Sequence, residues 1–470
     1  MKHFLKRLLG FSMGPIFGAI ISFIQVPILS YFLAEAEYGR ASLFQTLMVT
    51  LPNYIYIGLD QSYTREYQQH KNKRELLQQA ALLPMIVGLL LFILMLFFSG
   101  DLSLWLFDNR DYYYIVWYGG IWVLSTILER FFLLAIRMEE KAFEFSSFSM
   151  LLKINVFLLS MFYILIGWRD FKVIVYGLIF GQLLGDLVLY VRYRNYFDVS
   201  GFKIDWPLIK QMLKFGLPIM VAVSLTNSLS AVDNIFLKQF RTLEEVAIYS
   251  VAAKVMMVIG VIKGSFTSFW VPTAYRWYEE KKEMRYFQYI SEAVLFILTG
   301  VFFGLLLFKG VVVMLFAERY QNIQYILGLM AFPQIMYTLS ETTNLGIVFS
   351  RKTHFNILVS IASFVPSVVL NYLLTPSFGY KGAAVASFAA YTMFYFSRTY
   401  FSNKMGFKFP QLKATLSILI MAFAALLNLL DLPFIELYTL LLGLVALVVQ
   451  WGTVRKTLDI RKNSLEWDFT

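Results

Sequence analysis

Hydrophobic stretches separated by short polar segments follow one another along almost the whole 470-residue chain. A helix needs about 20 mostly apolar residues to cross the hydrocarbon core of a bilayer. Fourteen stretches approach this length, and they predict an all-α polytopic membrane protein with about 14 transmembrane helices. The predicted spans are 8–33, 41–59, 76–98, 112–136, 143–166, 173–191, 215–237, 246–270, 289–308, 323–349, 355–374, 382–400, 414–430 and 434–451. The first is too long for a signal peptide and lacks a clear cleavage site, so we expect it to remain as a helix.

Lys and Arg residues lie mainly on one side of these spans. With a cytoplasmic N-terminus, the cytoplasmic segments hold 27 of the 41 basic residues and the opposite segments hold 9. Cytoplasmic loops of membrane proteins collect positive charge, so this bias predicts that both termini are cytoplasmic. It also explains the net charge of +11 without a nucleic-acid partner. Five basic residues lie inside spans, namely Arg130, Lys153, Lys254, Lys263 and Arg398.

The two halves of the chain resemble each other. Each opens with a basic amphipathic segment, at 5–11 and 209–215, and each has an acidic turn after its first span, at 35–39 and 243–247. Six helices per copy give both copies the same orientation, which predicts a parallel repeat with a central cavity between two lobes. The predicted units are an N-terminal lobe (1–198), a cytoplasmic linker (199–214), a C-terminal lobe (215–402), and two further spans with a cytoplasmic tail (403–470).

Composition agrees with a bilayer environment and narrows the chemistry. Hydrophobic residues make up 59% of the chain and charged residues 15%, against about 25% charged in a typical soluble domain. There are no cysteines, and the three histidines lie near polar segments, so no metal site and no cofactor are predicted. No loop is long enough for a soluble catalytic domain, and we find no paired carboxylates or phosphate-binding glycine loop. The protein is therefore predicted not to be an enzyme.

Three stretches carry a family resemblance. They are the acidic turn 33–39, the Lys-Phe-Gly-Leu-Pro segment 214–218 and the Gly- and Ala-rich segment 370–387. Together they resemble Wzx-type polysaccharide flippases of the multidrug/oligosaccharidyl-lipid/polysaccharide exporter superfamily. Locally, Gly379 and Gly382 suit a tight turn, and the alanines that follow allow close helix packing.

This resemblance implies a substrate and a mechanism. Such proteins move isoprenoid-diphosphate-linked oligosaccharides from the cytoplasmic to the outer leaflet by alternating access between two lobes. It implies the inner or plasma membrane of a bacterium or archaeon, contact with membrane lipid, and cooperation with other polysaccharide-assembly proteins. The repeat architecture suggests that a monomer is sufficient.

Ionisable residues inside spans are the candidate functional residues, since a charge there costs at least about 2.5–3.5 kcal/mol. Lys153 lies ten residues into the fifth span, about 15 Å deep. There it contacts a diphosphate in the cavity, pairs with Glu129, or does both, with Glu129 neutralising it until a diphosphate takes its place. Arg130 either contacts the diphosphate or extends to the headgroups.

The second half holds the remaining candidates. Lys254 and Lys263, also considered as diphosphate contacts, point to opposite sides of one helix because nine residues at 100° each make two and a half turns. Glu341 with Lys263, and Asp233 with Lys254, either form structural pairs or act in the cavity, and the sequence does not choose between these roles. Asp60, Asp186, Glu292 and Arg398 are expected near the cytoplasmic boundary, in solvated or topological roles.

The driving force and two other functions stay open. An inside-negative potential favours outward movement of an anion by about 2.3 kcal/mol per charge per 100 mV, and proton or sodium antiport through Asp233 or Glu341 is the alternative. A multidrug cation antiporter of the same superfamily should show unpaired acidic residues at mid-depth, whereas the deepest charge here is Lys153. A membrane polysaccharide polymerase or glycosyltransferase, or a scaffold in a synthesis complex, is less favoured.

Overall fold

The computed structural model describes residues 2–350, 352, 354–430 and 432–462, and within these ranges it contains helices and no strand. The first half comprises α1 (Lys2–Phe32), α2 (Glu35–Ile55), α3 (Leu59–Glu66), α4 (Lys73–Phe97), α5 (Ser99–Phe107), η1 (Arg110–Tyr112), α6 (Tyr113–Met138), α7 (Ala142–Leu165), α8 (Lys172–Arg192) and η2 (Arg194–Phe197). The rest comprises α9 (Trp206–Phe240), α10 (Leu243–Glu279), α11 (Met284–Leu307), α12 (Lys309–Val313), η3 (Glu318–Tyr325), α13 (Leu327–Thr343), α14 (Leu345–Phe349), α15 (His354–Lys404), α16 (Leu412–Leu427), α17 (Ile435–Val449) and α18 (Trp451–Lys462).

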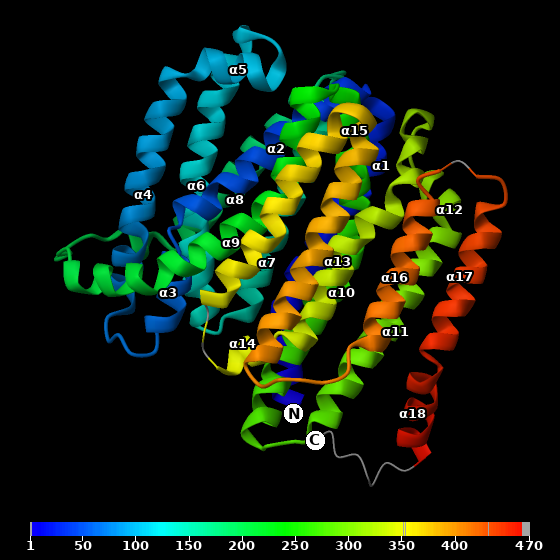
Figure 1. The fold of residues 1–470 in the computed structure, drawn as a ribbon. Coiled ribbons are helices and arrows are strands. Elements are labelled where there is room, and N and C mark those ends of the chain that lie inside the picture. The colour runs from blue at the N-terminus through cyan, green and yellow to red at the C-terminus, as the bar shows by residue number, and fades with distance from the viewer. Residues whose placement is uncertain (1, 351, 353, 431, 463–470) are drawn as a thin grey trace.

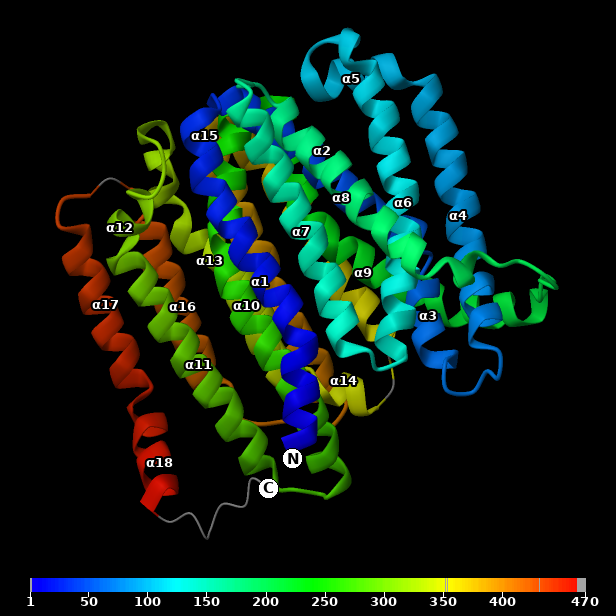
Figure 2. The ribbon, with the colours of Figure 1, turned by 180° about the vertical axis from the view of Figure 1, so that it is seen from behind.

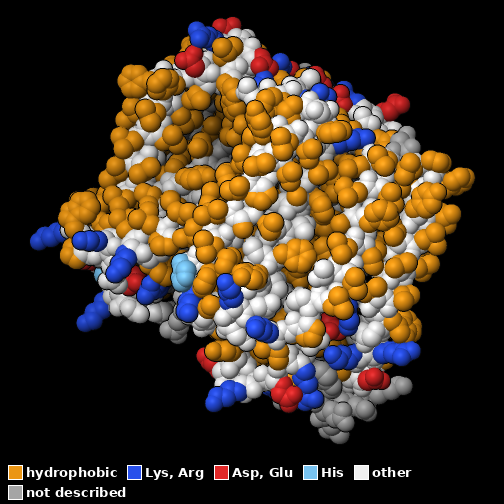
Figure 3. Space-filling model, in the orientation of Figure 1, with side chains coloured by type: hydrophobic (Ala, Val, Ile, Leu, Met, Phe, Trp, Pro, Cys, Tyr) orange, Lys and Arg blue, Asp and Glu red, His pale blue; other side chains and the backbone are white. Residues whose placement is uncertain are grey.

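The helices have the lengths and composition of membrane spans. In the part of the chain that the structure describes, eight helices are long and apolar enough to cross a membrane. The number is nine if the bent pair α17 and α18 counts as one span. Figure 3 shows hydrophobic side chains over the middle of one face, with Lys and Arg gathered toward its lower end. The prediction of an all-α polytopic membrane protein is confirmed. Most predicted spans overlap one helix each, but 355–374 and 382–400 both lie in α15, and 323–349 covers the end of η3 together with α13 and α14. The count of fourteen stays a prediction.

The helices form one elongated bundle (Figures 1 and 2). The α4–α6 pair lies at one side of the bundle, and α11, α16, α17 and α18 lie at the other. In between, α2 packs on both α9 and α10, and α1 packs on α7 and α10. These contacts join the first half of the chain to the second. The beginning of α1 and the end of α18 lie toward the same end of the bundle.

The long helix α15 reverses direction at Gly379, which explains why one continuous element contains two predicted spans (Figure 1). Gly379 has φ 57° and ψ −137°, a combination that is essentially restricted to glycine. A Cβ atom there would lie 1.8 Å from Oε2 of Glu245. The same carboxylate accepts hydrogen bonds from the backbone N–H of Tyr380 (2.7 Å) and from Arg241 (2.7 Å). The turn in α15 is thus fixed to the α9–α10 turn.

The acidic turn that precedes α2 packs against the second half. A Cβ atom on Gly39 would lie 1.9 Å from the carbonyl oxygen of Leu243, so only glycine permits this approach. Tyr38 is fully buried beside it, and the Glu37 carboxylate accepts a hydrogen bond of 2.9 Å from the backbone N–H of Phe171. The turn therefore joins the two halves at one end of α2.

Gly379→Ala should lower the thermal stability of the detergent-purified protein, because the backbone conformation costs about 1–3 kcal/mol for a non-glycine residue and the new methyl group displaces Glu245. Gly300→Ala is the matched control: it lies exposed on α11 with nothing within 4 Å of its Cβ position. Equal unfolding temperatures for the two variants would contradict the proposed constraint at Gly379.

Candidate functional site

A cavity of about 490 Å³ lies between helices of the first half and α9, the first helix of the second half. Its walls come from α2, α3, α6, α7, α8 and α9, and Figure 3 shows the surface hollowed between the α4–α6 pair and the rest of the bundle. The lining residues are Val49, Pro52, Asn53, Tyr56, Gly58, Asp60, Gln61, Trp122, Thr126, Glu129, Arg130, Lys153, Gln182, Ile219, Met220, Val223 and Asn227.

Arg130 lies in this wall with a carboxylate partner. Its Nη2 is 2.8 Å and its Nε 3.3 Å from Oδ2 of Asp60. The Asp60 side chain is 7% exposed, whereas that of Arg130 is 42% exposed. The prediction that Asp60 is a solvated boundary residue is wrong, because the turn before α3 directs its side chain into the bundle.

Glu129 precedes Arg130 on α6, and neutral side chains hold its carboxyl group. The Gln182 amide donates to its Oε2 (2.5 Å) and to the Thr126 hydroxyl (3.1 Å), and accepts from the Trp122 indole N–H (3.0 Å). The hydrogen bond from Gln182 therefore fixes the position of the Glu129 carboxyl group in the cavity wall.

Lys153 enters the cavity from α7. Its side chain is exposed there, and it makes no hydrogen bond and no salt bridge with any residue that the structure describes. The predicted ion pair with Glu129 is thus not formed. Gly18 of α1 leaves room for it, since a Cβ there would lie 3.1 Å from Cγ of Lys153. Of the four charged groups in the wall, this ammonium alone lacks a direct partner within the described structure.

Amide groups complete the polar surface on the α9 side. The side chain of Asn227 donates to that of Asn53 across the cavity (3.1 Å), and the Ser224 hydroxyl donates to the Asn53 carbonyl (3.0 Å). Tyr54 and Ser228 are joined by their hydroxyl groups at 2.6 Å. The cavity wall is therefore shared by both halves of the chain.

Lys254 and Asp233 lie outside this cavity and do not pair with each other. The Lys254 ammonium donates to the hydroxyl of Tyr38 (3.2 Å), across the contact between α10 and α2. Asp233 is fully buried and accepts hydrogen bonds from Tyr249, Asn371 and Ser387, which come from α10 and from both arms of α15. The predicted pair is wrong, because the two side chains leave their helices toward different neighbours.

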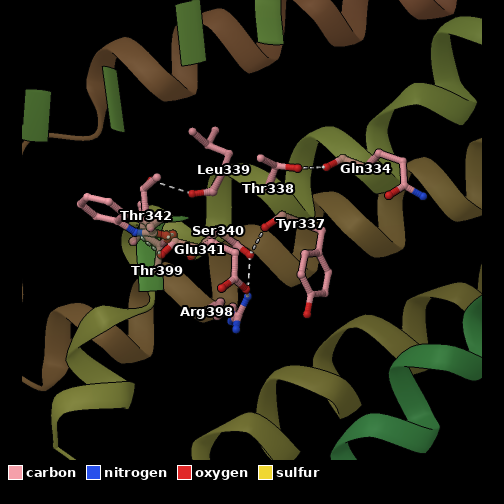
Figure 4. Close-up of polar contacts among 11 residues, drawn as sticks. Gln334, Tyr337, Thr338, Leu339, Ser340, Glu341, Thr342, Arg398 and Thr399 are labelled. Atoms are coloured by element: carbon pink, nitrogen blue, oxygen red, sulfur yellow. Dashed lines mark hydrogen bonds and ion pairs between the residues drawn. The ribbon is translucent and has the colours of Figure 1, made fainter. Parts of the chain in front are cut away.

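Glu341 pairs with Arg398 rather than with Lys263. Figure 4 shows the Arg398 guanidinium pointing at Glu341 and Ser340, at 2.7 Å from Oε1 and 2.8 Å from Oγ. Arg398 is only 13% exposed, so its predicted solvated role is also wrong. The ammonium of Lys263 lies 4.3 Å from the ring centre of Tyr337 instead.

Two further acids differ from their predicted solvated roles. Asp186 is fully buried; its Oδ2 accepts from the Ser125 hydroxyl (2.6 Å), and its Oδ1 has no partner among the described residues. Glu292 accepts from Lys413 (2.6 Å) and Gln288 (2.8 Å) between α11 and α16. Depth along a helix could be estimated from the sequence, but the direction of each side chain could not.

The structure thus brings together Lys153, Arg130 and Glu129 and leaves the other four candidates elsewhere. Charge alone guided the prediction, so it missed the neutral groups of the wall, above all Gln182, Asn53 and Asn227. Amides inside apolar spans were the available signal. Among the described residues, no group of three or more His, Cys, Asp or Glu is placed to hold a metal ion.

The fold is that of known membrane transporters. It matches the lipid II flippase MurJ in an inward closed conformation over 95% of this chain and 99% of the other, with a TM-score of 0.71 and 16% identity. It also matches a multidrug resistance MATE family transporter of the MOP superfamily in its inward-facing conformation, over 83% of this chain and 94% of the other, with a TM-score of 0.64 and 14% identity.

Sequence comparison then defines the family. The family described as polysaccharide biosynthesis protein matches residues 4–278. A putative O-antigen transporter of Shigella flexneri is 25% identical over 214 residues, which are 45% of this chain and 51% of that relative, so only about half of its length is matched. The chain belongs to the polysaccharide biosynthesis protein family, and the resemblance to Wzx-type flippases is confirmed. These relatives are transporters rather than enzymes, as predicted.

Lys153→Cys should react with a membrane-impermeant maleimide, because the side chain lies exposed in a polar cavity. The chain has no native cysteine, so labelling reports this site alone. Leu158→Cys, exposed on the same helix among apolar residues, and Ser160→Cys, fully buried, are the matched controls and should stay unlabelled. Labelling that is no faster at 153 than at 158 would contradict a water-filled cavity at Lys153.

Proposed function

We propose that the protein moves isoprenoid-diphosphate-linked oligosaccharide from the cytoplasmic to the outer leaflet for cell-surface polysaccharide synthesis. The observation that carries this proposal is the free ammonium of Lys153 in a cavity that also exposes Arg130. A diphosphate loses water as it enters a membrane protein, and fixed cations replace that hydration. The transporter fold and the family membership support the same function.

The other polar side chains of the cavity wall can form hydrogen bonds with the glycan. Sugar hydroxyl groups both donate and accept hydrogen bonds, as do the amides of Asn53, Gln182 and Asn227 in the wall. Trp122 offers an aromatic edge in the same cavity. We propose that the sugar adjoining the diphosphate lies against these groups, while the lipid chain remains in the bilayer.

Alternating access follows from the predicted division into two lobes, 1–198 and 215–402, joined by the linker 199–214 and followed by 403–470. The cavity wall contains α2 and α9, which belong to different proposed lobes. Separation of the lobes at one end and then at the other would expose the cavity to each side in turn. We propose both termini in the cytoplasm, a location in the bacterial or archaeal plasma membrane, and function as a monomer.

Export of multidrug cations is the second candidate, favoured by the MATE-like fold and by two acids in the cavity wall. Each acid has a direct partner, however: Asp60 binds Arg130, and Glu129 binds Gln182. Lys153 has none among the described residues. An anion therefore gains more from entering this cavity than a cation does.

Transfer between leaflets should be measured in liposomes that contain the purified protein and a polyprenyl-diphosphate oligosaccharide. A membrane-impermeant glycan probe reports the sugar that has crossed. Lys153→Ala should lower the transfer rate by at least about tenfold, and Lys153→Arg should restore part of it, since a cation remains. Lys210→Ala, on the exposed beginning of α9, is the control.

Each outcome of this assay is informative. Transfer that persists in Lys153→Ala would retain the flippase function and remove Lys153 from the site. No transfer by the wild-type protein with several glycans, combined with export of a lipophilic cation, would replace the proposal by drug export.

We further propose that Asp233 couples transport to an ion. This buried carboxylate is held only by neutral donors from three membrane segments, so a proton or sodium ion bound there would change their packing. With the membrane potential clamped at zero, Asp233→Asn should abolish the acceleration produced by a pH or sodium gradient and leave the basal rate unchanged. A gradient effect equal to that of the wild type would assign the coupling elsewhere, for example to the pair Glu341 and Arg398.

A further inference from the structure

The chain forms a strained elbow at residues 56–58, between α2 and α3. Tyr56 and Gly58 of this elbow line the cavity. Ile57 has φ 53° and Gly58 has φ 70°, and the helix is interrupted for three residues, 56–58, although none of them is a proline. A β-branched residue with positive φ is a genuine outlier, and such a conformation persists only where the surroundings enforce it. Contacts elsewhere must therefore hold the elbow.

Three of those contacts come from α9, in the second half of the chain. The backbones of Gly58 and Gly216 touch, since a Cβ on Gly58 would lie 2.1 Å from the Gly216 carbonyl oxygen. The hydroxyl of Ser62 donates to the Met212 carbonyl (2.7 Å), and the Arg65 guanidinium lies 4.2 Å from the ring centre of Phe215. The elbow thus exists where α3 is packed against α9.

The elbow also decides where Asp60 lies. This residue is the second of α3, two positions after Gly58, and its carboxylate lies 2.8 Å from the guanidinium of Arg130 of α6. Gln61 donates to the same oxygen at 3.0 Å. If Ile57 and Gly58 relaxed to helical angles, α2 and α3 would become one helix, and Asp60 would leave this position.

We propose that Asp60 is a positioning residue, which serves as a removable counter-ion for Arg130. While α3 is packed on α9, the elbow presents Asp60 to Arg130 and lowers the attraction of that guanidinium for an anion. When the two halves separate at this contact, the elbow relaxes and Arg130 becomes available. Anion binding in the cavity is thereby coupled to the contact between the halves. This inference rests on the proposed transport of an anionic lipid-linked substrate.

Binding of inorganic pyrophosphate to the purified full-length protein tests the counter-ion. Asp60→Asn, which keeps the shape of the side chain, should raise the affinity by about threefold to tenfold, because a half-exposed pair is worth up to about 1 kcal/mol and a more buried one is worth more. Arg130→Gln should lower the affinity, and the double variant should bind like Arg130→Gln alone. If Asp60 has a purely structural role, Asp60→Asn will produce no gain in pyrophosphate affinity that depends on Arg130.

Gly216→Ala tests the link to α9 without altering any charge. Its Cβ would lie 2.6 Å from the Gly58 carbonyl oxygen and 2.9 Å from the Ser62 hydroxyl, so it should displace α3 and raise pyrophosphate affinity as Asp60→Asn does. In the Asp60→Asn background it should add nothing. Gly300→Ala is again the control. If Asp60→Asn does not fold, Gly216→Ala with and without Arg130→Gln decides the question.

Two results would overturn the inference, and they are separable from failure of the proposed function. Lower affinity in Arg130→Gln with unchanged affinity in Asp60→Asn would show that Asp60 does not restrain Arg130. A gain in Gly216→Ala that persists undiminished in the Asp60→Asn background would break the link between the elbow and this pair. Unchanged affinity in both Arg130→Gln and Lys153→Ala would instead contradict the anion site itself.

Discussion

An ionisable side chain inside a membrane-spanning bundle needs a counter-ion, hydrogen-bonding neighbours or water, and this constraint organises the protein. Buried charges cannot remain isolated in a medium of low dielectric constant. Where the bundle is closed, each acid has donors within reach: Arg398 for Glu341, and three neutral groups for Asp233. In the cavity wall shared by the two halves, by contrast, Lys153 has no hydrogen-bond or ion-pair partner among the described residues. The cavity is thus the place where water and an anionic ligand take over the role of the counter-ion.

Periodicity and charge predicted the class of fold, because hydrophobic length and loop charge act locally along the chain. The same pattern placed Lys153, Arg130 and Glu129 at depths that suit one cavity. The sequence pattern did not predict the direction in which a side chain leaves its helix, and this direction decides which residues pair. Asp60 and Arg130 are 70 positions apart, and nothing in either segment indicates that a turn at Ile57 aims one at the other. That turn exists through contact with Gly216, which no local pattern contains.

The contacts of α2 bear on how the proposed separation of the two halves could be reversible. Gly39 approaches the backbone of Leu243 at one end of the helix, and Gly58 approaches that of Gly216 just beyond the other end. Both contacts depend on the absence of a side chain, so they bury little apolar surface and each costs little to break. Larger interlocking side chains at these points would make one closed state too stable to leave.

The spacing of these two contacts is close to the thickness of the membrane's hydrocarbon core. Gly39 and Gly58 are 19 residues apart, about 28 Å along a helix. A rigid α2 held at both ends keeps the halves together, and release at one end leaves the other as a pivot. The strained elbow lies at only one of these ends. The two ends are therefore unequal in energy, and separation at the Gly58 end relieves strain that separation at the Gly39 end retains. In the proposed alternating-access cycle, such an asymmetry would favour opening of one side of the cavity in the absence of substrate, and a ligand that replaced Asp60 at Arg130 would add to it.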